Sequence, residues 1–312
     1  MSSMKTSKEN KMNSYKKLVY GYNADFLSYL KTQFAIDSTK FPLVSREKHP
    51  KDSVVKVGDV SFGGGYNYPI IAGPCGLETE SQAISSALSM KKLGVHIFRG
   101  FIWKGRTNPY SFQGVGEKGI TWLKKVKEKT GLPVDTEILS EEHLELVKDV
   151  VDIVQIGARN MQNYELLKAV SRISTPVILK NGPGSGIDEL LCAAEYIAKG
   201  GNRNIILCLR GTKSLAGSGA RFTLDMSAIS ILKHLTCFPV IGDPTHPADH
   251  SSIIPSVAFG ITACGADGLL VEVHKNPSDA LTDKRQLLDY EKFSETLNFI
   301  NGILRVVGKT VV

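Results

Sequence analysis

The feature that most constrains the fold is a regular alternation, from residue 69 onward, of short apolar runs with longer stretches of helical periodicity. The apolar runs are five to seven residues long, a length typical of buried strands. They cover residues 69–73, 95–99, 133–137, 151–156, 175–180, 204–209, 238–242 and 267–273. The helical stretches lie near residues 79–92, 117–130, 140–149, 162–172, 187–199, 225–235, 249–264 and 289–304. Eight strands and eight helices in near-strict alternation favour an α/β fold with a closed (β/α)8 TIM barrel, and an open doubly wound sheet is the second interpretation.

The chain before this alternation divides into two short parts. Residues 1–35 are expected to form an N-terminal extension, partly mobile at its Ser-, Lys- and Asn-rich start, with one short helix over residues 19–35. Residues 36–68 are expected to form a small β cap, because a hairpin pattern over residues 53–62 has Gly-Asp in its turn. Residues 69–312 are then predicted to form the barrel as one domain.

Charge and hydropathy exclude several kinds of partner. The formal net charge is +7, and five lysines within the first seventeen residues contribute much of it. No nucleic-acid-binding signature accompanies this charge, so no nucleic acid partner is expected. No apolar run approaches the length of a membrane span, and the polar start lacks the apolar centre of a signal peptide. The sequence therefore predicts a cytoplasmic protein without a membrane partner.

A cationic loop follows the second predicted strand. Arg99, Lys104 and Arg106 lie within eight positions, in a segment that also contains helix-breaking Gly, Asn and Pro residues. A planar guanidinium and a lysine ammonium both suit phosphate or carboxylate oxygens. The loop is therefore a candidate site for one or more small anions, although a solvated basic loop explains this stretch equally well when it is considered alone.

The other strand ends strengthen the first interpretation. An ionisable or metal-binding side chain follows every predicted strand; in strand order these are Cys75, Arg99, Glu137, Arg159, Lys180, Arg210, Asp243 with His246, and Glu272 with His274. In a TIM barrel the carboxyl ends of all strands meet at one rim, where the active site lies. The same type of residue at eight strand ends is difficult to explain in a scaffold without a binding site.

Two sets of side chains follow from this arrangement. The cations are Arg99, Lys104, Arg106, Arg159, Lys180 and Arg210. So many positive charges at one rim repel one another unless anions lie between them, so the set predicts two anionic sites, for instance two phosphates with an added carboxylate. Each cation taken singly is more often a salt-bridge partner than a ligand contact.

The second set could hold a metal ion. Cys75, His246, Glu272 and Asp283 offer sulfur, nitrogen and oxygen ligands that suit Mn²⁺, Fe²⁺, Co²⁺ or Zn²⁺. Their spacing along the chain is wide and gives a weak signal by itself. A buried cysteine, an exposed histidine and two surface carboxylates remain the alternative on these residues alone.

Several long motifs resemble those of 3-deoxy-D-arabino-heptulosonate 7-phosphate (DAHP) synthases of type I-beta. They are the Ile-Ala-Gly-Pro-Cys of residues 71–75, Arg-Thr at 106–107 with Pro-Tyr-Ser-Phe-Gln-Gly at 109–114, Gln-Ile-Gly-Ala-Arg-Asn-Met-Gln-Asn at 155–163, Asp-Pro-Thr-His at 243–246 and Val-Glu-Val-His at 271–274. The resemblance extends from about residue 41 to 293. The 3-deoxy-octulosonate 8-phosphate synthases of the same superfamily are a weaker match, because the Arg-Thr motif and its sequel belong to the heptulosonate branch.

The resemblance implies a metal-dependent transferase of the shikimate pathway of aromatic amino acid biosynthesis, which condenses phosphoenolpyruvate with erythrose 4-phosphate and releases phosphate. It also implies roles for thirteen residues. The metal ligands would be Cys75, His246, Glu272 and Asp283, and the phosphoenolpyruvate contacts Arg99, Lys104, Arg159, Lys180 and Arg210. Arg106 and Thr107 would bind the aldose phosphate, and Lys104, Glu137, Asp243 and His246 would act in catalysis. A homodimer or homotetramer is expected, and the N-terminal part is too short for the regulatory domain of some relatives, so no feedback inhibition through such a domain is expected.

Four positions depart from the family pattern. Gly76, Gly105, Asn181 and Leu209 stand where the family usually has Ser, Pro, Arg and Glu, and the loop 211–222 is also unusual. These changes fall near the aldose phosphate side of the expected site. They leave open a paralogue that uses a different aldose phosphate in a specialised pathway. A non-catalytic ligand sensor is a third hypothesis, disfavoured because all four expected metal ligands are present.

Overall fold

The computed structural model describes residues 23–213 and 221–311, and these contain a closed barrel of eight parallel strands. The barrel strands are β3 (Ile70–Gly73), β4 (Ile97–Arg99), β5 (Val134–Ile138), β6 (Ile153–Ile156), β7 (Val177–Lys180), β8 (Ile205–Leu209), β11 (Val240–Gly242) and β12 (Leu269–Glu272). They follow one another around the barrel in chain order, and β12 pairs with β3 to close it. The (β/α)8 prediction is confirmed, and the open doubly wound sheet is wrong.

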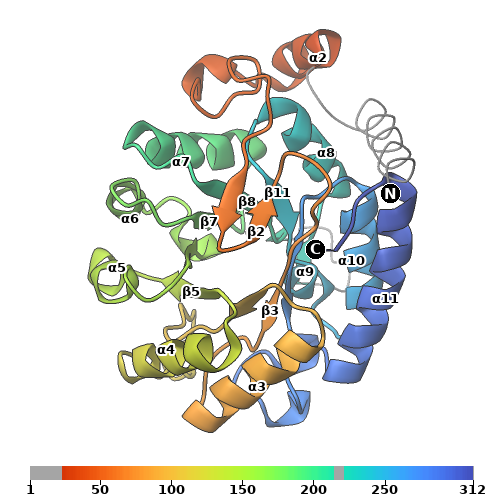
Figure 1. Cartoon of the computed structure of the whole chain (residues 1–312). Helices are drawn as coiled ribbons and strands as arrows, with labels where there is room; N and C mark the ends of the chain where they lie inside the picture. The colour runs from red at the N-terminus through yellow and green to blue at the C-terminus, as the bar shows by residue number, and fades with distance from the viewer. Residues whose placement is uncertain (1–22, 214–220, 312) are drawn as a thin grey trace.

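Helices cover the outside of the barrel (Figure 1). They are α3 (Glu80–Lys92), α4 (Lys118–Thr130), α5 (Glu141–Val147), α6 (Tyr164–Val170), α7 (Ile187–Lys199), α8 (Met226–Leu235), α9 (Thr245–Ala248), α10 (Ile254–Ala263) and α11 (Tyr290–Val307). Short polar side chains begin several of them: Thr79, Ser140 and Asn163 accept a hydrogen bond from the backbone N–H three residues later. The single helix predicted over 249–264 is wrong at its start, because Asp249 adopts a left-handed conformation that ends α9 before α10 begins.

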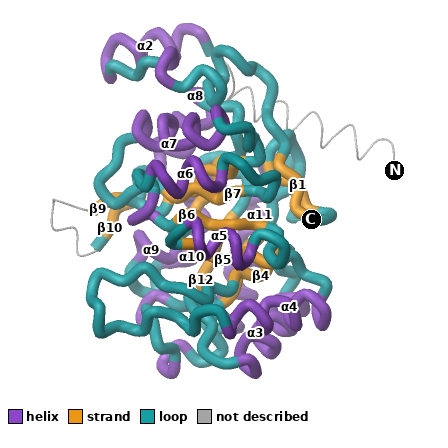
Figure 2. The backbone as a smooth tube through the Cα atoms, turned by 90° about the vertical axis from the view of Figure 1, so that its left-hand side faces the viewer, coloured by secondary structure: helices purple, strands orange, loops and turns teal. Residues whose placement is uncertain are grey.

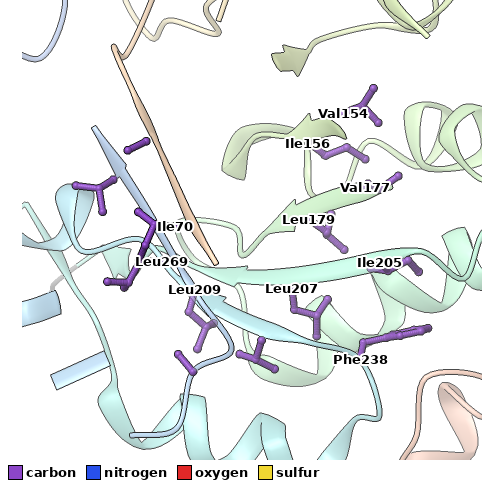
Figure 3. Packing of buried hydrophobic residues seen from close by; sticks show 14 of the residues in the cluster. Ile70, Val154, Ile156, Val177, Leu179, Ile205, Leu207, Leu209, Phe238 and Leu269 are labelled. Carbon is purple, nitrogen blue, oxygen red and sulfur yellow. The ribbon is translucent and has the colours of Figure 1, made fainter. Parts of the chain in front are cut away.

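The barrel strands are buried on both faces: the outer face packs against the helices, and the inner face fills the interior of the barrel. Outward-facing residues such as Val154, Leu179 and Leu207 pack against the helices in the main hydrophobic core (Figure 3). Inward-facing residues alternate with them along each strand, as strand geometry requires. At the N-terminal half of the barrel the inward-facing side chains are apolar: Ile71, Ile97, Ile153, Ile178, Ile206, Ile241 and Leu270.

The predicted hairpin closes the N-terminal end of the barrel. Strands β1 (Val55–Val57) and β2 (Val60–Phe62) pair antiparallel, with Gly58 of the two-residue turn at a φ of 57°. Val55, Val57, Val60 and Phe62 join the same buried cluster as the apolar interior of the barrel. In Figure 1 the hairpin lies across the middle of the ring of helices. The apolar interior is therefore shielded from water at this end.

The remaining described elements lie at the edges of the molecule. Helix α2 (Ala24–Phe34) lies within the range predicted for an N-terminal helix, and residues 1–22 are outside the described part of the chain. The short strands β9 (Thr212–Lys213) and β10 (Phe222–Thr223), which the sequence did not predict, pair in the loop after β8. Figure 2 shows them on the side of the molecule opposite to β1. No described helix combines the length and the apolar composition needed to span a membrane.

Candidate active site

The inward-facing side chains at the C-terminal half of the barrel are polar. They are Arg99, Asp135, Glu137, Gln155, Lys180, Asp243 and Glu272, with Cys208 among them. Above this layer lies a cavity of about 250 Å³. Ten of the thirteen predicted site residues line it: Lys104, Arg106, Thr107, Glu137, Arg159, Lys180, Arg210, His246, Glu272 and Asp283. The other three, Cys75, Arg99 and Asp243, each bond directly to one of these ten. The structure therefore brings the whole predicted set together.

The loop after β4 folds back on itself and so places its cations. The backbone N–H of Lys104 donates to the Gln113 carbonyl at 2.9 Å, and Trp103 forms an isolated bridge with Gly114. The Trp103 ring also stacks on His143 of α5, with ring centroids 3.9 Å apart. These contacts hold the start of the loop against the barrel, and Lys104 and Arg106 face the cavity from it.

Three of the four predicted metal ligands form one cluster. One ligand atom each of Cys75, Glu272 and Asp283 lies within 4.8 Å of the other two. His246 is next to this cluster, with its Nε2 4.0 Å from Glu272 Oε1. The three residues come from the loop after β3, the end of β12 and the loop beyond it, so only the closure of the barrel assembles them.

The donor set of this cluster fits a divalent transition metal. A thiolate, an imidazole and two carboxylates are the ligand types that Mn²⁺, Fe²⁺, Co²⁺ and Zn²⁺ accept. Burial and the Glu272 carboxylate raise the pKa of Cys75 to about 12, so without a cation the side chain is a thiol. The thiol donates to Asp283 Oδ2 at 3.1 Å, and Lys104 Nζ lies 3.0 Å from the same sulfur. A bound cation would replace this proton.

Glu272 is held from several sides. Arg99 donates to its Oε1 at 2.9 Å and Gln286 donates to its Oε2 at 3.1 Å, and none of these groups is solvent-exposed to a significant degree. Burial alone would raise the pKa of Glu272, but Arg99 and His246 lower it well below its usual value. Glu272 is therefore an anion, with one fixed orientation. Gln286 was missed in the sequence, where nothing distinguishes it from an ordinary loop residue.

A second buried carboxylate, Asp243, links the ends of β7 and β11 and the start of α9. Asp243 Oδ2 accepts hydrogen bonds from Lys180 Nζ at 2.7 Å and contacts His246 Nδ1 at 2.6 Å. Its other oxygen accepts from the backbone N–H groups of Thr245 and His246. Burial would raise the pKa of Asp243, but His246 and Lys180 lower it well below its usual value. The carboxylate thus orients both the lysine and the imidazole, whose Nε2 is left to face Glu272.

Three arginines contribute to the lining of the cavity. Arg159, Arg210 and Arg221 all line it, and Arg210 lies over the Phe222 ring with its guanidinium 3.8 Å from the centroid. Burial, together with the charges of Arg159 and Arg221, lowers the pKa of Arg210 to about 10. Such a cluster of cations favours an anion between them. Arg221 was missed in the sequence, because it follows a long loop rather than a strand end.

Glu137 depends on a glycine in the next strand's loop. A Cβ atom at Gly157 would lie 1.9 Å from Glu137 Oε1, so only glycine leaves room for the carboxylate in this position. The sequence singled out Glu137 by its place at the end of a strand, but it gave no sign that Gly157 supports it. The carboxylate and Gly157 both line the cavity.

The four departures from the family pattern are accommodated without strain. Cβ atoms added at Gly76 and Gly105 would meet neighbouring atoms only at 3.5 Å or more. Asn181 is buried and accepts from the backbone N–H of Arg210 at 2.7 Å, so it supports the chain next to that arginine. Leu209 faces the main hydrophobic core.

The fold and the site together define a (β/α)8 barrel protein in which the C-terminal ends of the strands surround a cavity lined by cations, next to a donor set suited to a divalent metal. The sequence matches the profile of the DAHP synthetase I family over residues 37–305, and the chain belongs to that family.

Named relatives agree with this assignment. The chain is 42% identical over 271 residues to the phospho-2-dehydro-3-deoxyheptonate aldolase of Thermotoga maritima, covering 87% of this chain and 80% of the relative. It is 30% identical to the 2-dehydro-3-deoxyphosphooctonate aldolase of Syntrophotalea carbinolica, covering 81% of this chain and 96% of that protein. The crystal structure of the Thermotoga maritima DAHP synthase superposes with a TM-score of 0.82 at 41% identity, covering 86% of this chain and 78% of that one. Its truncated form gives 0.81 at 40% identity, covering 88% and 100%.

Proposed function

We propose that the protein is a DAHP synthase, a transferase that condenses phosphoenolpyruvate with erythrose 4-phosphate and releases phosphate. The observation that carries this proposal is a single cavity in which cations from the ends of different strands surround the Cys75, Glu272 and Asp283 cluster. Two phosphorylated substrates need such a surplus of positive charge, because they repel each other when they are brought into reactive contact. Membership of the family and the relatives' names support the same reaction.

The cations divide between the two substrates. Phosphoenolpyruvate binds deep in the barrel, where its phosphate and carboxylate meet the positive charges of Lys104, Arg159, Lys180 and Arg210, which line the cavity, and of Arg99, which is buried next to Glu272. The aldose phosphate binds nearer the mouth, with its phosphate at Arg106 and Thr107. Arg106 pairs with Asp283 at 3.3 Å and Thr107 accepts from Arg159 at 3.3 Å, so both residues lie where the two substrates would meet.

The metal site is part of the proposal. Cys75, His246, Glu272 and Asp283 would hold one divalent ion, of the Mn²⁺, Fe²⁺, Co²⁺ or Zn²⁺ type. When bound, such an ion supplies a Lewis acid that polarises the aldehyde of the aldose. Arg99 and Gln286 fix the Glu272 carboxylate, and Lys104 supports the Cys75 side chain.

The side chains of the protein stabilise the charges that develop during the reaction. C3 of phosphoenolpyruvate forms a bond to the aldehyde carbon, water adds at C2, and the bond from C2 to the phosphate oxygen then breaks. The cations around the phosphate stabilise the charge that moves onto it, without reorganising during the reaction. Glu137 lies in the cavity wall and is placed to accept a hydrogen bond from the water that adds. Asp243 holds Lys180 and His246 in place throughout.

The test is an assay of phosphate release by the metal-loaded protein with phosphoenolpyruvate and a panel of aldose phosphates. We expect erythrose 4-phosphate to be the preferred partner, with a heptulosonate product identified by mass. Arabinose 5-phosphate serves as the comparison, since octulosonate enzymes are among the relatives. Failure to react with erythrose 4-phosphate, while another aldose phosphate reacts, would refute the assignment.

A further inference from the structure

One buried carboxyl in the barrel interior has no place in the mechanism given above. Asp135 lies on β5, two residues before Glu137, and is fully buried. Its inward direction follows from strand alternation, because Val134 on the same strand packs in the outer core. Neither of its side-chain oxygens has a hydrogen-bond partner among the residues that the structure describes. A buried carboxylate without a hydrogen bond is costly, so the neutral form is favoured at such a position.

The charges that face Asp135 come from four strands. Arg99 on β4 is its register partner, Glu137 is on its own strand, Lys180 approaches from β7, and Cys208 approaches from β8. Burial raises the pKa of Asp135 to about 7, whereas Arg99 and Lys180 oppose this rise and Glu137 adds to it. Cys208 is a neutral thiol, because burial raises its own pKa to about 12. The two cations are thus the only described neighbours that favour the ionised form of Asp135.

Both of these cations are already engaged elsewhere. Arg99 donates through NH1 to Glu272, and Lys180 donates to Asp243. Within residues 23–213 and 221–311, the Nε and NH2 groups of Arg99 have no hydrogen-bond partner, although Asp135 is on the adjacent strand. Both groups are buried and Arg99 does not line the cavity, so an anionic ligand acts on Arg99 through its charge, whereas Lys180 lines the cavity directly. A ligand that brings negative charge to Arg99 and Lys180 weakens the stabilisation that these two cations give to ionised Asp135.

We propose that Asp135 couples the binding of phosphoenolpyruvate to the uptake of a proton, so that the enzyme binds this anion and one proton together. The inference rests on the proposed function, in which phosphoenolpyruvate brings its negative charge to Lys180 and to the buried Arg99. The ligand carries a carboxylate and a phosphate, and its charge raises the affinity of the Asp135 carboxylate for a proton. Asp135 touches neither substrate. It is a positioning residue: when it takes up a proton it loses its own negative charge, which would otherwise lie beneath the bound anion.

The sign of the pH dependence follows from linkage. The bound state holds more protons than the free state, so affinity for phosphoenolpyruvate falls as the pH rises above 7, where free Asp135 is ionised. The fall is steepest between the pKa of Asp135 in the free enzyme and its higher pKa in the complex, and approaches about tenfold per pH unit there. Below pH 7 free Asp135 is already protonated and the effect disappears.

The experiment is isothermal titration of phosphoenolpyruvate into the metal-loaded enzyme at pH 7.5–8, in buffers of different ionisation enthalpy. At this pH the phosphate of the ligand is already ionised, because phosphate monoesters lose their second proton near pH 6. The slope of heat against buffer enthalpy gives the number of protons taken up. We expect between about one half and one proton per ligand in the wild type, and none in Asp135→Asn or Asp135→Leu, the second variant serving if the first is unstable.

The matched control is Cys208→Ala, another buried residue of the barrel interior, which keeps the carboxyl and should keep the proton uptake. Wild-type binding without proton uptake, or equal uptake in the wild type and the Asp135 variants, would overturn the inference and leave the proposed function standing. Absence of any binding of phosphoenolpyruvate would instead contradict the proposed function.

Discussion

Lys180 and Asp243 form a buried ion pair, with Nζ and Oδ2 2.7 Å apart and both side chains almost fully inaccessible to solvent. The pair joins the ends of β7 and β11, which are separated by β8 in the barrel. His246 contacts the same carboxylate oxygen at 2.6 Å. One carboxylate therefore fixes a cation that faces the cavity and an imidazole next to the candidate metal ligands.

Replacing this carboxylate tests its role. Asp243→Asn keeps the shape of the side chain but removes the charge that holds Lys180 and His246. Because positioned charges in active sites are each worth about 10²- to 10³-fold in kcat, we expect a loss of that order. Steady-state kinetics measures it. Glu165→Gln, in the exposed pair with Lys168, is the control and should leave kcat unchanged. Near wild-type kcat in Asp243→Asn would show that the pair has no catalytic role.

Substitution of two buried cysteines tests which part of the barrel interior binds the metal ion. Cys75 and Cys208 are both buried, and burial raises the pKa of each to about 12, but only Cys75 belongs to the ligand cluster. We expect Cys75→Ala to lose bound metal and activity, and Cys208→Ala to retain both. Elemental analysis of the purified proteins gives the metal content, and removal of the ion by a chelator should abolish wild-type activity reversibly. Equal metal content in the two variants would place the site elsewhere.

Substitution of Gly157 tests whether the position of the Glu137 carboxylate matters, because it displaces this carboxylate without removing it. In Gly157→Ala the new Cβ would lie 1.9 Å from Glu137 Oε1, so the carboxylate must move away. The backbone of Gly157 has a φ of −67°, which alanine adopts without strain, so stability should change little. We expect kcat to fall by about tenfold or more, since general acid–base groups contribute about 10²- to 10⁴-fold.

The control for this substitution is another glycine in a loop of the same barrel end. A Cβ at Gly184 would meet nothing within 4 Å, and Gly184→Ala should keep full activity. Equal kinetics in the two variants would mean that the position of Glu137 does not matter for the reaction.

The opposite end of the barrel provides a stability prediction. Asp267 is buried and bonds to Lys233 and Lys309. Burial would raise its pKa, but the two lysines lower it below the usual value. Because the folded-state pKa is below the unfolded one, this stabilisation is fully present above about pH 4 and is lost as the pH falls through the folded pKa.

Asp267→Asn leaves two buried lysines without their carboxylate. We expect a loss of about 3–5 kcal/mol in the free energy of unfolding at pH 7, as found when one partner of a buried ion pair is removed. Urea denaturation at pH 7 and at lower pH measures it, and the variant should lose less stability than the wild type on acidification. A matched change at the exposed pair of Lys148 and Glu145, Glu145→Gln, should have little effect. Similar stabilities for both variants would contradict the prediction.

The sequence by itself determined the eight strand–helix units, the hairpin turn and the residues at the strand ends. These features depend on local patterns: short continuous apolar runs for the buried strands, an apolar period near 3.6 for the helices, and a Gly-Asp pair that suits a two-residue turn. The sequence also shows an ionisable residue, such as Lys180 or Glu272, at the end of each apolar run, and this identified the candidate site residues.

Only the tertiary structure decided how these residues meet. Closure depends on the pairing of β12 with β3, between residues such as Leu269 and Ile70 that are far apart in the chain. The same closure brings Cys75 to Glu272 and Asp283, leaves room for Glu137 at Gly157, and buries Asp135 where no described residue gives it a hydrogen bond. Contacts of this kind depend on distances across the barrel, and a local sequence pattern does not encode those distances.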